Sequence, residues 1–466
     1  MKFLLLRCGD NKEKQGTRDE PFFTSGMYPP LGLLHIGAAL EQDGHTVEVI
    51  DFYHEPLSDE RLQQILQNVD AVGMSIYTDN YEYSGHIIEK IKKIKPSIPV
   101  IIGGPHCIFF KKQSLSMIPQ ADIGVIGEGD HVILHIVRYL QGKKNLADIH
   151  GIVYRKNGQI KLGKSLQVVQ NLDSLPIPAR HLVEKYDYGK FPGGDSFKKK
   201  FTSMLTSRGC PFHCRFCARY GNVINKYKFR QRSAASVIKE FQELDKQYRS
   251  VMIVDDNFLA DIKRAHAICD ALIAMNSGIE LLIMGARVDS ANEELYRKMR
   301  RAGVRYVGFG IESGNQDVLD YYKKNITIEQ IRKAVKLSRR MGFFTNATFI
   351  LGAPIEDKNH LENTIKFACS LPLDLAIFGV LHYHMGSELW DEAVQQNIIS
   401  KDDYLTPVTS KRGVGNFTYE ELRRYCALAF KRFYLRPSYL LDQFARAAAR
   451  RDIGYIKNGF RFMAFV

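Results

Sequence analysis

Short apolar runs alternate with helix-like stretches over the first 145 residues. The runs lie at residues 2–6, 46–51, 71–76, 99–104 and 121–127. Most of their positions are apolar, with little of the alternation between apolar and polar residues that a half-exposed strand shows. Strands that are buried on both faces have this composition, and they belong to parallel sheets covered by helices. We therefore expect an α/β fold that begins with an open, doubly wound parallel sheet over residues 1–145.

A second series of six such runs begins at about Phe201. The runs lie at residues 201–207, 250–256, 281–287, 305–313, 345–353 and 375–383. Six β/α units are too few for a closed eight-fold barrel, so the pattern predicts a partial (β/α)6 barrel over residues 200–390. From about Trp390 the strand pattern fades, and helices predict a C-terminal cap over residues 391–466.

Residues 146–199, between the two series, are expected to form a connector. Asn157 and Gly158 stand between two strand-like stretches, which is a strong signal for a hairpin. Pro176 and Pro178 would stiffen the chain that follows. We expect residues 189–200 to be a mobile loop.

Composition limits the class of protein. A chain of 466 residues with 45% hydrophobic and 25% charged residues is typical of a soluble globular protein of two or three domains. No apolar run approaches the roughly 20 residues of a membrane-spanning helix, and the first apolar run is too short for a signal peptide. Five of the eight cysteines are scattered singly, which argues for reduced thiols and a cytoplasmic location.

The net charge of +14 is spread along the chain, and basic residues are concentrated only near its end. From Leu422 to Val466 there are ten Lys or Arg residues against two Asp residues. A solvated helix face, an acidic substrate or an anionic lipid surface would each explain them, whereas no nucleic-acid-binding module accompanies the charge. We expect a small-molecule, largely apolar substrate whose acidic end Arg436 or Arg461 orients between cap and barrel. We also expect a monomer with possible peripheral membrane contact and no nucleic-acid partner.

Three cysteines lie within eight positions, in the loop that follows the first strand of the second series. Cys210, Cys214 and Cys217 have the spacing C-x3-C-x2-C. Three thiolates suit a [4Fe-4S] cluster that leaves one iron open for chemistry. Zinc is the alternative, but it needs a fourth ligand, and His213 inside the motif is badly placed to serve.

The motif, with Phe216 before its third cysteine, resembles the signature of the radical S-adenosylmethionine (SAM) superfamily. The resemblance extends to the branch of that superfamily that carries an N-terminal cobalamin-binding domain. It rests on residues 29–51 and 100–106 in the first series, and on residues 254–261, 285–289, 299–314, 349–354 and 433–437 in the second.

The resemblance implies three cofactors: a [4Fe-4S] cluster, SAM and cobalamin. Cys210, Cys214 and Cys217 would hold the cluster, and Glu312 matches a position that contacts SAM. Further candidate SAM contacts stand at strand ends on the face where barrel catalysis is built, and they are Asp255, Asp256, Asn257 and Arg287. Arg287 could bind the methionine carboxylate as a bidentate fork, or could merely pair with Asp289.

Small and polar residues follow the predicted strands of the first sheet, at the edge where such sheets bind ligands. They are Ser75, Tyr77, Thr78, Gly103, Gly104, Pro105, His106, Gly127 and Glu128. Simple turn chemistry would also explain the glycines. By position, Tyr77 would lie beneath the cobalt, and the nucleotide tail would pass Gly103 and Gly104. The loop from Arg7 to Pro30 contains no histidine, so the D-x-H-x-x-G cobalt ligand of methionine synthase is missing, and His106 reads as a loop residue.

Two functions fit these motifs. The first is an enzyme that cleaves SAM to a 5'-deoxyadenosyl radical, abstracts hydrogen from an unactivated carbon and transfers to it a methyl group from methylcobalamin. The second is a cobalamin-dependent radical SAM cyclase or ring-rearrangement enzyme without net methylation. A light or redox sensor is disfavoured because it would leave the cysteine loop without a purpose. Either enzyme would need an electron donor such as flavodoxin or ferredoxin.

Overall fold

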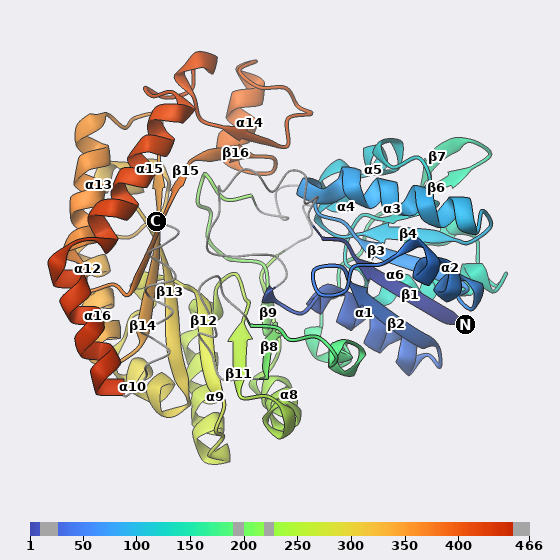
Figure 1. The fold of residues 1–466 in the computed structure, drawn as a ribbon, viewed down its shortest axis with the longest axis horizontal. Coiled ribbons are helices and arrows are strands. Elements are labelled where there is room, and N and C mark those ends of the chain that lie inside the picture. The colour runs from blue at the N-terminus through green and yellow to red at the C-terminus, as the bar shows by residue number, and fades with distance from the viewer. Residues whose placement is uncertain (10–26, 190–199, 219–227, 451–466) are drawn as a thin grey trace. The chain divides into compact units, whose positions relative to one another are not determined.

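The computed structural model describes residues 1–9, 27–189, 200–218 and 228–450 (Figure 1). Among these residues the chain forms two compact units. The N-terminal unit extends to Tyr188, and the C-terminal unit begins at Gly189.

The N-terminal unit is built on one seven-stranded sheet with the order β2-β1-β3-β4-β5-β6-β7. Its strands are β1 (Lys2–Arg7), β2 (Thr46–Asp51), β3 (Ala71–Ser75), β4 (Val100–Gly103), β5 (Ile123–Val125), β6 (Ile152–Lys156) and β7 (Gln159–Leu162). Its α-helices are α1 (Leu31–Gln42), α2 (Asp59–Gln67), α3 (Tyr81–Ile94), α4 (Pro105–Phe110), α5 (Lys112–Met117) and α6 (Gly129–Leu140). Strands β1 to β5 are all parallel, as the continuous apolar runs predict.

Helices cover both faces of this sheet, because alternate side chains of each strand point to opposite faces. Leu4 and Leu6 of β1 share one buried cluster with Leu62 of α2 and Ile88 of α3. Helix α1 packs against β1, β2 and α6 instead. The predicted doubly wound sheet is confirmed.

The predicted hairpin is present and extends this sheet. β6 pairs antiparallel with β5, and β7 pairs antiparallel with β6. Asn157 (φ 52°) and Gly158 (φ 73°) both adopt the left-handed conformation that a two-residue hairpin turn requires. Residues 152–162 therefore belong to the N-terminal sheet, whereas residues 190–199, most of the expected mobile loop, lie outside the described residues.

The C-terminal unit is built on six parallel strands in the order β15-β14-β13-β12-β11-β8. They are β8 (Phe201–Met204), β11 (Ser250–Ile253), β12 (Glu280–Ala286), β13 (Val304–Glu312), β14 (Phe344–Leu351) and β15 (Leu375–Val380). Each strand lies beside the next strand of this series, and β8 and β15 form the two edges of the sheet, which is therefore open. This is the expected partial (β/α)6 barrel.

Helices connect and cover these strands (Figure 1). They are α8 (Ala234–Gln247), α9 (Ile262–Met275), α10 (Glu293–Arg301), α11 (Gln316–Tyr321), α12 (Ile328–Arg340), α13 (Lys358–Ser370), α14 (Glu388–Gln395), α15 (Tyr419–Tyr434) and α16 (Pro437–Arg450). Local sequence explains their limits, as α12 shows. A reciprocal capping box of Thr327 and Gln330 starts it, and the apolar Ile331, Ala334 and Val335 recur on its buried face.

The region after Trp390 differs in two ways from the expected helical cap. It contains a short strand, β17 (Leu405–Pro407), which pairs antiparallel with β16 (His382–His384). In addition, α15 packs against β14, β15 and α13, so it belongs to the helical layer of the barrel (Figure 1). Among the described residues, no helix is long and apolar enough to cross a membrane.

Candidate active site

The three cysteines lie in the loop after β8, as predicted. This loop starts with β9 (Ser207–Arg208), which pairs antiparallel with β10 (Arg230–Gln231). All three thiols are partly exposed, and the backbone turns between two of them because Cys217 N donates to Cys214 O at 3.1 Å. Burial, together with the neighbouring charges of Cys214 and Asp256, raises the pKa of Cys217 to about 12. We call residues 207–217 the cysteine loop.

The donor set of this loop fits a [4Fe-4S] cluster. Within the described residues, no three His, Cys, Asp or Glu side chains are grouped as the ligands of one metal ion. In a [4Fe-4S] cluster each cysteine thiolate binds a different iron. The three sulfur donors leave the fourth iron without a protein ligand from this loop.

Asp255, at the end of β11, holds the start of the cysteine loop. Its Oδ1 accepts from Thr206 N at 2.6 Å, and its Oδ2 accepts from Thr206 Oγ1 at 2.5 Å and Ser207 Oγ at 2.7 Å. The pKa of Asp255 is raised overall, because the effect of burial exceeds the lowering by these hydrogen bonds. The two carboxylate oxygens thus fix the exit of β8. This contact joins two strand ends that are 49 residues apart in sequence.

Asp256 and Asn257 continue from Asp255 beside the same loop. Desolvation and the negative charge of Asp255 raise the pKa of Asp256. The pKa of Cys210 is raised mainly by burial, with a smaller contribution from the charge of Asp256. Asn257 is buried, and its Oδ1 makes no hydrogen bond within the described part of the chain. A buried, unpaired acceptor is costly in a native protein, so this atom marks a place where a donor from a ligand or water would be favourable.

Glu312 ends β13 in a left-handed conformation, with φ of 72°. Its Oε1 accepts from Lys324 Nζ at 2.8 Å, and its Oε2 accepts from Thr348 Oγ1 of β14 at 3.4 Å. The carboxylate is buried beside the strand ends, where the resemblance places a SAM contact. A non-glycine residue with positive φ is uncommon and is found at sites where surrounding structure holds it in place.

Arg287, after β12, pairs with Asp289, which is the alternative that the sequence left open. Its Nε and one terminal nitrogen donate to the Asp289 carboxylate at 2.9 to 3.2 Å. The same terminal nitrogen donates to Lys324 O at 2.7 Å, and the guanidinium stacks 3.7 Å from the ring centre of Phe212 in the cysteine loop. Arg287 therefore braces the cysteine loop, whatever it binds in addition.

Arg215, between the second and third cysteines, clamps the loop from its other side. Its Nε donates to Glu388 at 2.9 Å, and a terminal nitrogen donates to Glu392, both on α14. Its backbone N donates to Tyr322 O at 3.0 Å, and its guanidinium lies 4.5 Å from the ring centre of Tyr321. This side chain is only 14% exposed, so the clamp is more strongly coupled than a surface ion pair would be.

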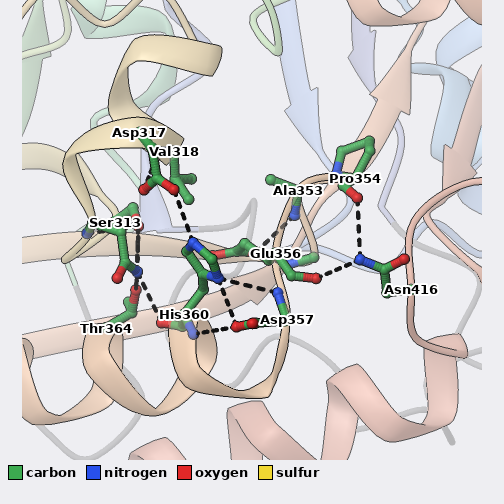
Figure 2. A network of polar contacts seen from close by, with 12 residues as sticks. Ser313, Asp317, Val318, Ala353, Pro354, Glu356, Asp357, His360, Thr364 and Asn416 are labelled. Carbon is green, nitrogen blue, oxygen red and sulfur yellow. Dashed lines mark hydrogen bonds and ion pairs between the residues drawn. The ribbon is translucent and has the colours of Figure 1, made fainter.

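A polar network fixes the backbone at the end of β14 (Figure 2). Glu356 is fully buried, and its Oε2 accepts from the backbone N of Gly352 at 2.6 Å and of Ala353 at 2.8 Å. Its Oε1 finds no hydrogen-bond partner among the described residues, and burial raises its pKa to about 7. Asn416 donates to Glu356 O at 2.8 Å, and His360 joins Asp317 to Asp357 nearby.

In the N-terminal unit, the candidate residues lie at or just after the carboxyl ends of β3, β4 and β5, at one edge of the sheet. Ser75 pairs in register with Gly103. Two features require glycine at position 104: its φ is +95°, and a Cβ there would lie only 2.9 Å from Ile76 O. Tyr77 is 49% exposed, whereas Thr78 Oγ1 is buried with no hydrogen bond to a described residue.

The other candidates of this edge are enclosed by protein. His106, which follows Pro105, stacks in parallel on Tyr81 at 5.0 Å, and neither ring nitrogen has a hydrogen-bond partner in the described residues. Burial lowers the pKa of His106 to about 4. Gly127 faces Leu166, and Glu128 accepts from Val169 N at 2.7 Å.

The expectation that Arg436 orients a substrate at the barrel mouth is wrong. Helix α15 runs antiparallel to the strands: Leu422 near its start packs at Gly352, just after β14. Tyr434 at its end hydrogen-bonds both N and O of Ala376, near the start of β15. Arg436 therefore lies at the amino ends of the strands, where it stacks 3.9 Å from the ring centre of Phe433. Arg461 lies outside the described residues.

Comparison with known proteins identifies both units. The model of the radical SAM superfamily matches residues 204–368, and that of the B12 binding domain matches residues 24–137. A relative from Pyrococcus horikoshii, described as an uncharacterized methyltransferase, is 31% identical over 426 residues, which cover 89% of each chain. The chain belongs to the family of cobalamin-dependent radical SAM methyltransferases. Its cofactors are a [4Fe-4S] cluster, SAM and cobalamin, as the resemblance implied.

Other members of this family and its neighbours match over most of their length. The anaerobic magnesium-protoporphyrin IX monomethyl ester cyclase of Rubrivivax gelatinosus is 26% identical over 94% of this chain and 80% of its own. The methyltransferase TsrM of Kitasatospora setae, solved with cobalamin and a [4Fe-4S] cluster, has a TM-score of 0.67 at 18% identity, covering 85% of this chain and 78% of its own. The cobalamin-dependent radical enzyme OxsB has a TM-score of 0.73 at 16% identity, covering 98% and 72%. These two likenesses show the shared fold.

Sequence reasoning missed several residues that shape the site. Arg215 joins the cysteine loop to α14, Lys324 pairs with Glu312, and Glu356 holds the end of β14. Arg215 had a usable signal, because a basic residue inside a three-cysteine motif invites a search for acidic partners. Lys324 had none, because it stands in a run of polar residues typical of an exposed turn.

Proposed function

We propose that this enzyme abstracts a hydrogen atom from an unactivated carbon of a small-molecule substrate and transfers a methyl group to that carbon. One observation carries the proposal. In a chain of this family, three thiols, Glu312 and Arg287 gather at the carboxyl ends of adjacent parallel strands. When bound, the cluster and SAM supply a 5'-deoxyadenosyl radical and cobalamin supplies the methyl group.

The residues of the barrel would bind and orient these groups. Cys210, Cys214 and Cys217 would hold three irons, with Phe216 packed behind them. Glu312 would accept hydrogen bonds from ribose hydroxyls or from the ammonium of SAM. Asp256 and Asn257 face the same edge, and the unpaired Oδ1 of Asn257 supports a ligand contact there. Asp255 and Arg287 would act mainly by holding the cysteine loop in place.

The edge of the N-terminal sheet would bind cobalamin. Ser75, Tyr77, Thr78, Gly103, Gly104, Pro105, Gly127 and Glu128 follow its strands. The exposure of Tyr77 supports its place beneath the cobalt, and the unpaired Thr78 Oγ1 supports a polar contact to the cofactor. The full burial of His106 supports a role in shaping the loop instead of binding cobalt.

Several finer assignments belong to this proposal. The cobalamin-binding domain would span residues 1–145 and would be extended by the hairpin of the connector, residues 146–199. The barrel would span residues 200–390, and residues 391–466 would cover it, with α15 as part of its helical layer. The substrate would be largely apolar, and an electron donor such as flavodoxin or ferredoxin would reduce the cluster. We place the enzyme in the cytoplasm as a monomer, with possible peripheral membrane contact; exposed Leu435, Leu441 and Phe444 on and beside α16 support the last point.

The test compares the metabolites and lipids of cells with and without the gene by mass spectrometry. A compound that gains one CH2 only when the gene is present supports methylation. Supplying methionine with a deuterated methyl group shows whether the added carbon comes from SAM. A Cys214→Ala variant is the control and should give no product. A product that lacks the added carbon would overturn the proposal.

A cyclase is the second candidate, because the cyclase relative of Rubrivivax gelatinosus aligns over 94% of this chain. It predicts a product changed by dehydrogenation, oxygenation or rearrangement, without a gain of CH2. The same mass measurement separates the two.

A further inference from the structure

The turn that links α11 to α12, residues 321–325, connects the predicted site residues to one another. Lys323 (φ 51°) and Asn325 (φ 53°) are both in the left-handed region. Carbonyl groups of the turn accept from two segments: Tyr322 O accepts from Arg215 N of the cysteine loop, and Lys324 O accepts from the guanidinium of Arg287, just after β12. The backbone of the turn is therefore held on two sides.

This turn sends two adjacent lysines in opposite directions. The side chain of Lys323 is 54% exposed and pairs with Glu388, whereas that of Lys324 is only 9% exposed. A buried ammonium is unfavourable unless a carboxylate compensates it. Lys324 has that partner, because its Nζ lies 2.8 Å from Glu312 Oε1. Burial by itself lowers the pKa of Lys324, but the nearby charge and hydrogen bond of Glu312 more than offset this effect. The pKa of Lys324 is raised overall, so Lys324 keeps its charge.

The charge of Lys324 is also directed at the cysteine loop. Its Nζ lies 5.6 Å from the ring centre of Phe216, the residue before the third cysteine. Phe216 directly precedes Cys217, so the ammonium stands beside the residues that would hold the cluster. Arg287 is a second cation at this loop, because its guanidinium lies 3.7 Å from the ring centre of Phe212. Of these two cations, Arg287 is paired with Asp289, and Lys324 with Glu312.

We propose that Lys324 is a positioning residue with two effects: it fixes the Glu312 carboxylate for SAM, and its buried positive charge makes the cluster easier to reduce. This inference rests on the proposed function. A cluster gains a negative charge on reduction, and nearby charge and hydrogen bonding set its reduction potential. A cation in a poorly solvated place stabilises that added charge more than a surface cation does, because solvent screens it less.

The experiment uses the full chain with reconstituted cluster. Redox titration followed by paramagnetic resonance gives the midpoint potential without SAM, and equilibrium dialysis gives the SAM affinity. We expect Lys324→Gln to lower the midpoint potential and to weaken SAM binding about tenfold or more, equivalent to about 1.4 kcal/mol. Lys324→Arg should keep the potential near that of the wild type. Lys336→Gln removes an exposed lysine of α12 and is the matched control, with no change in either quantity.

A Lys324→Gln variant with wild-type potential and SAM affinity would overturn the inference. If this variant fails to load iron, Glu312→Gln decides, because it removes the anion that offsets Lys324. Without its anion Lys324 is more easily deprotonated, so the titration is run at a pH low enough to keep Lys324 protonated. The midpoint potential should then rise, and an unchanged potential at that pH contradicts the proposed charge effect. A wild-type protein that binds no cluster would instead contradict the proposed function, so the two failures are distinguishable.

Discussion

Glutamine in place of Glu356 tests whether the carboxyl at the end of β14 is protonated in the folded protein. The side chain is fully buried, and only one of its oxygens is paired. Its pKa is raised to about 7 from an ordinary 4.5. An acid with a raised pKa binds more protons in the folded than in the unfolded state between these values. Stability is therefore lost as the pH rises from 4.5 through 7.

The size of the effect follows from the two pKa values. Integrating the linkage relation between pH 5 and pH 8 gives a loss of about 2 to 3 kcal/mol for one such carboxyl. Glu356→Gln keeps an oxygen that can accept from Gly352 and Ala353 but cannot ionise. We therefore expect the stability difference between Glu356→Gln and wild type to shift by about 2 to 3 kcal/mol in favour of the variant over this range.

Native-state hydrogen exchange of peptides from β14 is the suitable assay, because a chain with two units need not unfold in one step. His360 also titrates nearby, since hydrogen bonds to Asp317 and Asp357 raise its pKa. Its contribution is likewise lost as the pH rises, so the comparison is repeated in a His360→Asn background. The reasoning would be refuted if the opening free energies of wild type and Glu356→Gln ran parallel from pH 5 to pH 8 in both backgrounds.

Three further predictions concern the cluster and the two units. Cys214→Ala should abolish binding of the [4Fe-4S] cluster, as measured by iron and sulfide analysis. Cys369→Ala, outside the loop, should retain the cluster, and equal iron in both variants would contradict the assignment. Asp255→Ala leaves the donors of Thr206 and Ser207 without an acceptor, so limited proteolysis should cut the cysteine loop faster than in wild type, and an unchanged rate would count against the role of Asp255. His106→Phe removes a group with its pKa lowered to about 4 from 6.5. Wild type should lose about 2 kcal/mol of stability in the N-terminal unit between pH 7 and pH 5 as the unfolded chain takes up the proton, and hydrogen exchange should show no such loss in the variant; a loss that persists means that another group causes it.

Much of the site could be predicted from local pattern. Cys210, Cys214 and Cys217 lie so close in sequence that one loop must carry them. Asp255, Arg287 and Glu312 follow three successive apolar runs, and parallel strands end at one edge of their sheet. Their neighbourhood therefore follows from strand periodicity and parallel topology. The hairpin could also be predicted from local sequence, because Asn157 and Gly158 both tolerate the positive φ that its turn requires.

The roles of these residues within the site needed the tertiary structure. The sequence pattern predicted Asp255 and Arg287 as cofactor contacts. In the structure, Asp255 accepts hydrogen bonds at the start of the cysteine loop, and Arg287 pairs with Asp289. Arg436 read as a substrate contact, but the direction of α15 places it at the amino ends of the strands. Contacts between distant segments decide these outcomes, and the sequence pattern records only which face or end a residue occupies.

The adjacent lysines 323 and 324 mark this limit most clearly. The sequence determined the two series of strands, the cysteine loop and the family of cofactors, because these depend on periodicity and on spacing over a few residues. It gave no sign that Lys324 points inward and Lys323 outward. A turn with two left-handed residues makes that choice, and a carboxylate twelve positions earlier stabilises it. The burial of a charge depends on a partner that only the folded chain brings within reach.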